Sequence, residues 1–244
     1  MTYEAHLAAA ERSAWPLETA IDWDGIDHEA ARCETDLLDA LHDAALVEGY
    51  LPLFVPRLMR LVWDDVDATA VLSLELYEGL RHFTALKRYL DRVGHTSARA
   101  MEANLLEARR RAVDLELDPA CILAHLTNFM CSELLAGRFF LQLSRRTREP
   151  VLRSLLSRMA RDEYRHCAGA ADLLRSRIAA DPAAVAAVLA AAERFRHYGS
   201  DVVEVPVAES NDFHSILAVN RKVRQVCGMA PIEHLKEELR NAAR

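Results

Sequence analysis

The segment Asp162-Glu163-Tyr164-Arg165-His166 contains a Glu-x-x-His step, the strongest local candidate for chemistry in this 244-residue chain. On a helix, residues three apart share a face, so a carboxylate and an imidazole at this spacing can bind one metal ion. The chain has 10 histidines and many glutamates, so roughly one such pair is expected by chance. Taken alone, the step is therefore weak evidence for a metal site, and a surface ion pair is the simpler interpretation.

Glu133 strengthens this candidate by its position. It lies in the apolar segment FMCSELLAGRFFLQL, and the midpoint between it and Glu163, residue 148, falls in a turn. Two antiparallel helices that fold back there bring both glutamates to one level. A carboxylate in an apolar segment needs a partner, either an arginine such as Arg138 or a metal ion, because burying an unpaired charge is costly.

The first half of the chain repeats this arrangement. Glu48 in ALVEGYLPLF and His82 in YEGLRHF are 34 residues apart, against 33 residues between Glu133 and His166. Two such Glu/His helix pairs are the ligand pattern of carboxylate-bridged di-iron bundles. Carboxylate oxygens and imidazole nitrogens suit iron or manganese and leave positions open for dioxygen.

Together these motifs resemble the ferritin-like di-iron oxidoreductases, most closely the soluble acyl-carrier-protein desaturases. The resemblance covers about residues 12–225 and rests on ARDEYRH, on VEGYLP, on LRH and on the position of Glu133, and Trp15 falls where that family has a lead-in tryptophan. It implies a ferritin-like four-helix bundle with additional helices and an acid at Asp162 that orients a ligand histidine. The iron ligands that it implies are Glu48, His82, Glu133, Glu163 and His166.

The chain departs from the family at two positions. Three residues before His82, where the family has its bridging glutamate, stands Gly79, with Glu78 and Glu75 as replacements. We prefer Glu78 as the sixth ligand, because it is nearly on the face of His82, whereas Glu75 lies about 10 Å along the helix axis. The second departure is Ala136, where desaturases tend to carry a threonine near the oxygen site, so oxygen activation is implied more strongly than desaturation.

Apolar periodicity and turn residues predict the helices that must position these groups. A single domain over residues 1–244 is expected, with a lead-in at 1–26 and a C-terminal extension at 198–244 that begins irregularly over 198–212. Pro52 and Pro56 should bend the first long helix. The predicted helices span 28–62, 67–93, 97–115, 119–145, 150–179, 183–197, 213–227 and 231–243.

Composition supports an all-α protein and excludes several functions. Only 8 Gly and 8 Pro are present, and alternation typical of a strand extends no further than VVEVPV. The net charge of −7 gives no basic field for nucleic acid or an anionic membrane. Five cysteines without a Cys-x-x-Cys step indicate a reducing compartment, and without a signal-like segment or a long apolar span we expect a cytoplasmic protein.

The leading hypothesis is an enzyme whose two iron ions use O2 and electrons from an external donor, such as a ferredoxin, to oxidise an organic substrate. The substrate is a small molecule or a carrier-protein-bound acyl chain, and a homodimer is common in the resembling family. His197 and His214 could line a substrate entrance, although the simpler expectation is a surface position. Other hypotheses are an N-oxygenase or other small-metabolite oxygenase, an iron-binding protein with ferroxidase activity, and a scaffold without metal, which Gly79 would favour.

Overall fold

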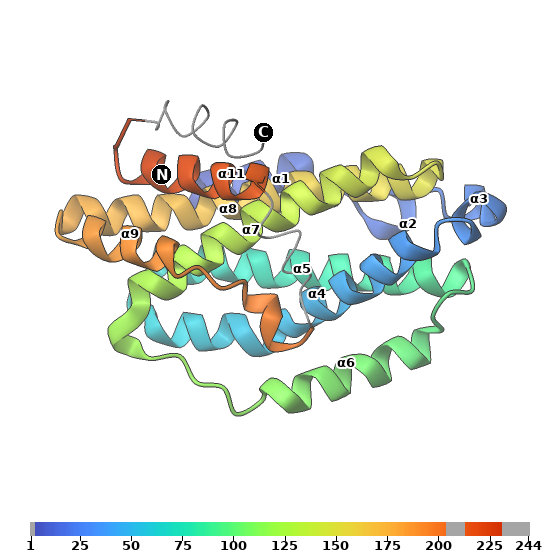
Figure 1. The fold of residues 1–244 in the computed structure, drawn as a ribbon, viewed down its shortest axis with the longest axis horizontal. Helices are drawn as coiled ribbons and strands as arrows, with labels where there is room; N and C mark the ends of the chain where they lie inside the picture. Colours follow the sequence, from blue (N-terminus) through green and yellow to red (C-terminus); the bar gives the residue numbers. More distant parts are fainter. Residues whose placement is uncertain (1–2, 204–212, 231–244) are drawn as a thin grey trace.

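The computed structural model describes residues 3–203 and 213–230, and over these residues the chain is helical with short turns and no strands, which confirms the all-α prediction. Figure 1 shows the arrangement. The elements are α1 (Tyr3–Ser13), α2 (Leu17–Ala20), η1 (Trp23–Gly25), α3 (His28–Arg32), α4 (Thr35–Leu61), α5 (Val66–Arg92), α6 (Ala98–Ala112), η2 (Pro119–Cys121), α7 (Ile122–Arg146), α8 (Pro150–Ala180), α9 (Ala184–Glu193), η3 (Tyr198–Asp201) and α11 (Phe213–Val226).

Four long helices form the bundle. α4 packs along α5 and α7 packs along α8, and the two pairs meet mainly where α5 contacts α8. After the first pair, α6 packs on the outer side of α4 and α5. α6 and the segment that follows it return the chain to the other end of the bundle, so that α7 is antiparallel to α4 (Figure 1). α1 packs on α5 and α8, while α9 and α11 cover α7.

The helix ends carry the signals that the sequence contains. The Asp65 side chain accepts a hydrogen bond from the Ala68 amide at the start of α5, and Glu149 does the same for Val151 and Leu152 at the start of α8. Such caps satisfy amides that have no partner within the helix. α5 ends before Gly94, whose φ of 75° is the left-handed conformation that closes a helix.

The predicted helix 28–62 is two helices, because the chain breaks between α3 and α4 at Cys33 and Glu34. The Glu34 carboxylate accepts hydrogen bonds from Thr147 Oγ1 and the Arg148 amide, both at 2.6 Å, and so ties this break to the α7–α8 turn. Pro52 and Pro56 lie inside α4 without ending it. The predicted helix 231–243 and most of the irregular segment 198–212 lie outside the described residues.

The bundle core is apolar at both ends and charged in the middle. One cluster of buried apolar residues includes Leu41, Leu86 and Leu155, and the other includes Leu58, Leu72 and Leu174. Between them the bundle buries acids and histidines of α4, α5, α7 and α8, which are Glu48, Glu75, Glu78, His82, Glu133, Asp162, Glu163 and His166. A layer of charged side chains inside an apolar core needs mutual or ionic compensation.

Among the described residues, one segment, Pro119–Arg146, is long and apolar enough to span a membrane by length and composition. Half of its most apolar window is buried inside the bundle. A core helix passes the same test, and the packing of α7 along α8 accounts for these apolar residues.

Candidate metal centre

Glu163 lies at the centre of the charged layer, between two histidines. Its Oε1 is 2.7 Å from His82 Nδ1, and its Oε2 is 3.1 Å from His166 Nδ1. The two imidazole rings are 6.1 Å apart between centroids. One carboxylate therefore presents one oxygen to each histidine, which is the arrangement of a ligand shared by two metal ions.

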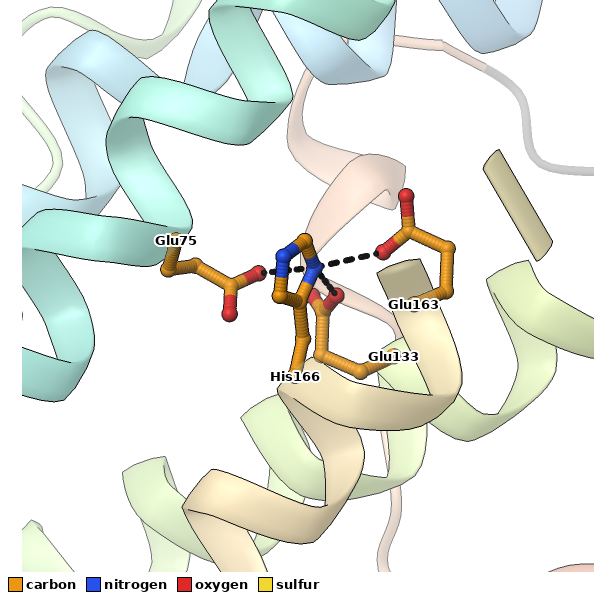
Figure 2. A group of neighbouring side chains, drawn as sticks. All are labelled: Glu75, Glu133, Glu163 and His166. Carbon is orange, nitrogen blue, oxygen red and sulfur yellow. Dashed lines mark hydrogen bonds and ion pairs between the residues drawn. The ribbon is translucent and has the colours of Figure 1, made fainter. Parts of the chain in front are cut away.

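Two groups of potential ligands meet at Glu163. In each group the donor atoms all lie within 4.8 Å of one another, and every member is buried. Figure 2 shows the larger group, in which His166 Nδ1 faces three carboxylates: 3.1 Å from Glu163, 3.2 Å from Glu75 and 3.5 Å from Glu133. The groups are Glu75, Glu133, Glu163 and His166, and Glu48, His82 and Glu163.

Helix register explains why these residues converge. Residues seven apart, such as Glu75 and His82 on α5, lie on one face of a helix two turns apart. α7 and α8 approach closely at Gly137, where an added Cβ would lie 3.3 Å from the Glu163 Cβ. This close approach, together with the turn midway between Glu133 and Glu163, brings those two carboxylates to one level.

The outer nitrogen of each histidine faces a second acid. His82 Nε2 lies 3.1 Å from Asp162 Oδ2, and His166 Nε2 lies 2.8 Å from Glu78 Oε2. A proton on each Nε2 would bond to these acids and leave the lone pair of Nδ1 directed at the ligand groups. Metal-binding histidines in proteins are held in this way.

Two arginines compensate the acids behind the histidines. Arg81 Nη2 contacts Glu78 at 3.1 Å and Asp162 at 3.0 Å, and Arg165 Nη2 contacts the same two acids at 2.5 and 2.9 Å. The Trp15 indole adds a hydrogen bond to Asp162 Oδ2 at 2.6 Å and stacks on the His82 ring. The positive charges of the two arginines thus match the negative charges of the two acids.

The structure brings together five of the six predicted ligands, Glu48, His82, Glu133, Glu163 and His166, and leaves Glu78 out of both groups. The structure thus groups Glu75, and not Glu78, with the other candidate ligands. On α5, Glu78 and His82 are four residues apart, and on α8, Asp162 and His166 are also four residues apart. Because the two helices are antiparallel, the acid of each helix lies level with the histidine of the other. Glu78 consequently faces the outer side of His166, as Asp162 faces the outer side of His82.

Packing against α4 accounts for a glycine, and not a glutamate, at residue 79. A Cβ at residue 79 would lie 2.1 Å from Leu51 Cδ1 and 3.3 Å from Glu48 Oε2. Leu51 of α4 therefore occupies the space that a glutamate side chain at this position would need. Glu75, one turn earlier, supplies a carboxylate to the group around His166 instead.

The unsatisfied atoms of the layer are suited to holding metal. Five buried donor atoms have no hydrogen-bond partner within the described part of the chain: both oxygens of Glu75, His82 Nδ1, Glu133 Oε2 and Glu163 Oε1. Buried polar atoms without partners are rare in proteins unless an ion or water satisfies them. The ligand groups contain four carboxylates, whose charge of −4 two divalent cations would balance.

Without metal, the ligand groups hold protons instead. Burial, followed by the charge of Glu163, raises the pKa of Glu133 to about 7, and burial also raises the pKa of Glu48 and, to a greater extent, of Glu75. Burial alone would lower the pKa of His82 and His166, but the surrounding carboxylates raise both well above the ordinary value. Metal binding must therefore displace protons from this layer.

Tyr198 is a part of the site that the motifs did not indicate, while His197 was considered for a substrate entrance. The Tyr198 hydroxyl donates a hydrogen bond to Glu133 Oε1 at 2.9 Å and is buried in η3. Burial and the nearby carboxylates raise its pKa well above 10, so the phenol stays neutral. His197 lines a cavity, whereas His214 is exposed at the start of α11. No local pattern in the sequence marks Tyr198, because the contact spans 65 residues.

A cavity of about 120 Å³ lies between α4 and α7 and reaches the centre at Glu48. Val47, Leu135, Ala136 and Phe139 make much of its wall. The Glu48 group contains three ligands against four in the other group. The group with fewer protein ligands is thus the one beside the cavity.

The fold and the site define an all-α helical bundle with a buried carboxylate and histidine cluster that could hold metal ions. Comparison of the chain with protein-family models, curated proteins and solved structures gives no match. The assignment of function therefore depends on the geometry of this site.

Proposed function

We propose that the protein is an O2-dependent, non-haem di-iron oxidoreductase that acts on an organic substrate. The observation that carries the proposal is the position of Glu163, with one oxygen directed at Nδ1 of His82 and the other at Nδ1 of His166. A shared carboxylate between two groups of oxygen and nitrogen donors is typical of carboxylate-bridged bundles. Manganese suits the same donors and is the other candidate metal.

In this proposal each group holds one ion, and Glu163 belongs to both. Asp162 and Glu78 would keep the proton of each histidine on Nε2, so that Nδ1 remains a ligand. The apolar clusters at both ends of the bundle exclude water from the layer. When bound, two ferrous ions would supply the reduction of O2, with further electrons from an external donor.

The cavity beside Glu48 favours an enzyme over an iron-storage protein. Its wall is mainly apolar and lies between α4 and α7 at the edge of the ligand layer. A path for hydrated iron would be expected to carry several acids, whereas Glu48 and Asp43 are the only carboxylates in the described lining of this cavity. The lining is instead suited to an organic substrate next to the metal ions.

Metal analysis after anaerobic loading with Fe(II) tests the proposal. We expect about two iron ions per chain, and Glu163→Ala should lose most of the metal because its carboxylate belongs to both groups. The matched control is Glu107→Ala, which changes an exposed glutamate of α6. Fewer than about one ion per chain in the wild type, or full metal content in the Glu163 variant, would contradict the proposal.

Oxygen consumption by the loaded protein separates the remaining functions. An oxidoreductase should consume O2 faster when a substrate and a reductant are added together. Ferroxidase activity that proceeds without organic substrate, and continues until many ions per chain are stored, would instead support an iron-storage protein. A protein that binds neither iron nor manganese would be a scaffold without metal.

A further inference from the structure

The cavity between α4 and α7 contains a cation, Arg138, that has no partner among the described residues. Arg138 lines it, and among the described residues no carboxylate or hydrogen-bond acceptor contacts its guanidinium group. Its Nε is buried without a hydrogen bond. The alternative that Arg138 pairs with Glu133 does not occur, because Glu133 contacts Tyr198 and His166.

The neighbours of Arg138 do not compensate its charge. Asp43 also lines the cavity, but its carboxylate lies 3.2 Å from His42 Nδ1 and is half exposed. Tyr164 is also near Arg138, but a phenol is uncharged near pH 7 and is therefore no counter-ion. A cation in an apolar cavity without a counter-ion is a site for an anionic group of a ligand.

His197 adds a neutral donor to the same cavity. Its Nδ1 accepts a hydrogen bond from the Gly199 amide at 3.0 Å, which places the proton of the neutral ring on Nε2. Burial lowers the pKa of His197 to about 4. The imidazole is therefore neutral near pH 7 and can donate a hydrogen bond to an oxygen without adding charge.

Position and volume limit the size of the ligand. Arg138 is five residues beyond Glu133 on α7, which corresponds to about 7.5 Å along the helix axis. The cavity of about 120 Å³ is slightly smaller than an engineered cavity of about 150 Å³ that binds benzene. An anionic group on Arg138 thus leaves room for a short apolar chain that ends near Glu48.

We propose that this cavity binds a free, short-chain carboxylic acid, with its carboxylate paired to Arg138 and its apolar chain directed along Leu135 and Ala136 toward Glu48. The inference rests on the proposed function, because it names the substrate class of that metal centre. It also distinguishes between the substrates considered above. The carbonyl of an acyl chain on a carrier protein is an uncharged thioester, which gives Arg138 no anion to pair with.

Binding of hexanoate to the iron-loaded protein under anaerobic conditions, followed by calorimetry, tests the inference. Hexanamide and the hexanoyl thioester of N-acetylcysteamine have the same chain without the charge and should bind at least about tenfold more weakly, as expected for the loss of a charge-assisted hydrogen bond. This comparison uses only wild-type protein, so it does not depend on the folding of a variant. Equal or tighter binding of the amide or the thioester would overturn the inference.

Two substitutions on α7 locate the binding site. Arg138→Gln should weaken hexanoate binding at least about tenfold while hexanamide binding stays unchanged. The matched control is Arg145→Gln, which removes an exposed arginine two turns further along the same helix and should not change the affinity. If Arg138→Gln binds hexanoate as the wild type does, the carboxylate binds elsewhere, for example on the metal, and the inference is wrong.

The metal content of the same samples separates this inference from the proposed function. A wild-type protein with two iron ions that binds no hexanoate would overturn the carboxylate site and leave the di-iron proposal standing. Hexanoate binding that depends on Arg138 in a protein that retains no metal would support the carboxylate site and contradict the di-iron proposal.

Discussion

His166 Nε2 lies 2.8 Å from Oε2 of Glu78, on the side of the imidazole ring that faces away from the ligand groups. This contact makes Glu78 the counterpart of Asp162, which holds His82 in the same way. Both acids are also paired with Arg81 and Arg165. In the proposed di-iron centre, Glu78 would therefore orient His166, and Glu75 would be the ligand.

Variants of these two glutamates should differ in metal content. Glu75→Gln removes a carboxylate from the group around His166 and should lower the iron content toward one ion per chain. Glu78→Gln should keep both ions but weaken their binding by about 10- to 100-fold, as is typical when the partner of a ligand histidine is lost. Chelator competition measures both effects, and a Glu75 variant that binds two ions with wild-type affinity would show that Glu75 is not a ligand.

Removal of metal should reverse the pH dependence of stability. In the metal-free protein the folded state raises the pKa of Glu133 to about 7 and raises that of both ligand histidines. The folded state then binds more protons than the unfolded state, so its stability falls as the pH rises from about 5 to 8. The carboxyls with lowered pKa, such as Glu78, titrate below this range and do not offset the effect.

Bound metal should stabilise the folded protein more strongly as the pH rises, because deprotonated ligands bind metal more tightly. The increase in melting temperature on adding Fe(II) should therefore grow between about pH 5.5 and 8. Thermal unfolding with and without chelator at several pH values measures this. An increase that is constant over the range would mean that no protons are displaced from the ligand layer.

The hydrogen bond from Tyr198 to Glu133 should contribute measurably to stability and to the position of the carboxylate. Tyr198→Phe removes the donor at 2.9 Å and should lower the free energy of unfolding by about 1.5–3 kcal/mol, the usual range for hydrogen bonds to charged groups. Denaturant unfolding measures the loss. Tyr164→Phe is the control, since that hydroxyl has no hydrogen bond within residues 3–203 and 213–230, and a similar loss in both variants would assign the effect to packing alone.

Gly79 and Leu51 should be energetically coupled. Gly79→Ala places a Cβ 2.1 Å from Leu51 Cδ1 and should destabilise the protein by about 1–3 kcal/mol, although alanine favours the helix by about 1 kcal/mol. Leu51→Ala alone leaves a cavity and also destabilises. The double variant should be less destabilised than the sum of the two losses, and strictly additive values would show that the close approach of α4 and α5 is not rigid.

Most helix boundaries could be predicted from the sequence because they depend on local chemistry. The caps at Asp65 and Glu149 and the glycine at residue 94 end or begin helices within a residue or two of the predicted positions. The break between α3 and α4 was missed, because it depends on contacts of Glu34 with the turn before α8. That contact joins residues more than 110 positions apart, and helix periodicity carries no information about it.

The sequence by itself determined the all-α class and the five candidate ligands that the structure brings together. It also determined that Glu133 and Glu163 lie at the same height in the bundle, since turn positions and the helix period place residues along the helix axis. The tertiary structure decided which of Glu75 and Glu78 lies among the candidate ligands, because this depends on how α5 faces His166 across the bundle. It also decided the contact of Tyr198 with Glu133 and the position of Arg138, which has no partner within the described part of the chain. Rotation of a helix about its axis and the filling of space between helices depend on all neighbours at once, and a one-dimensional pattern does not record them.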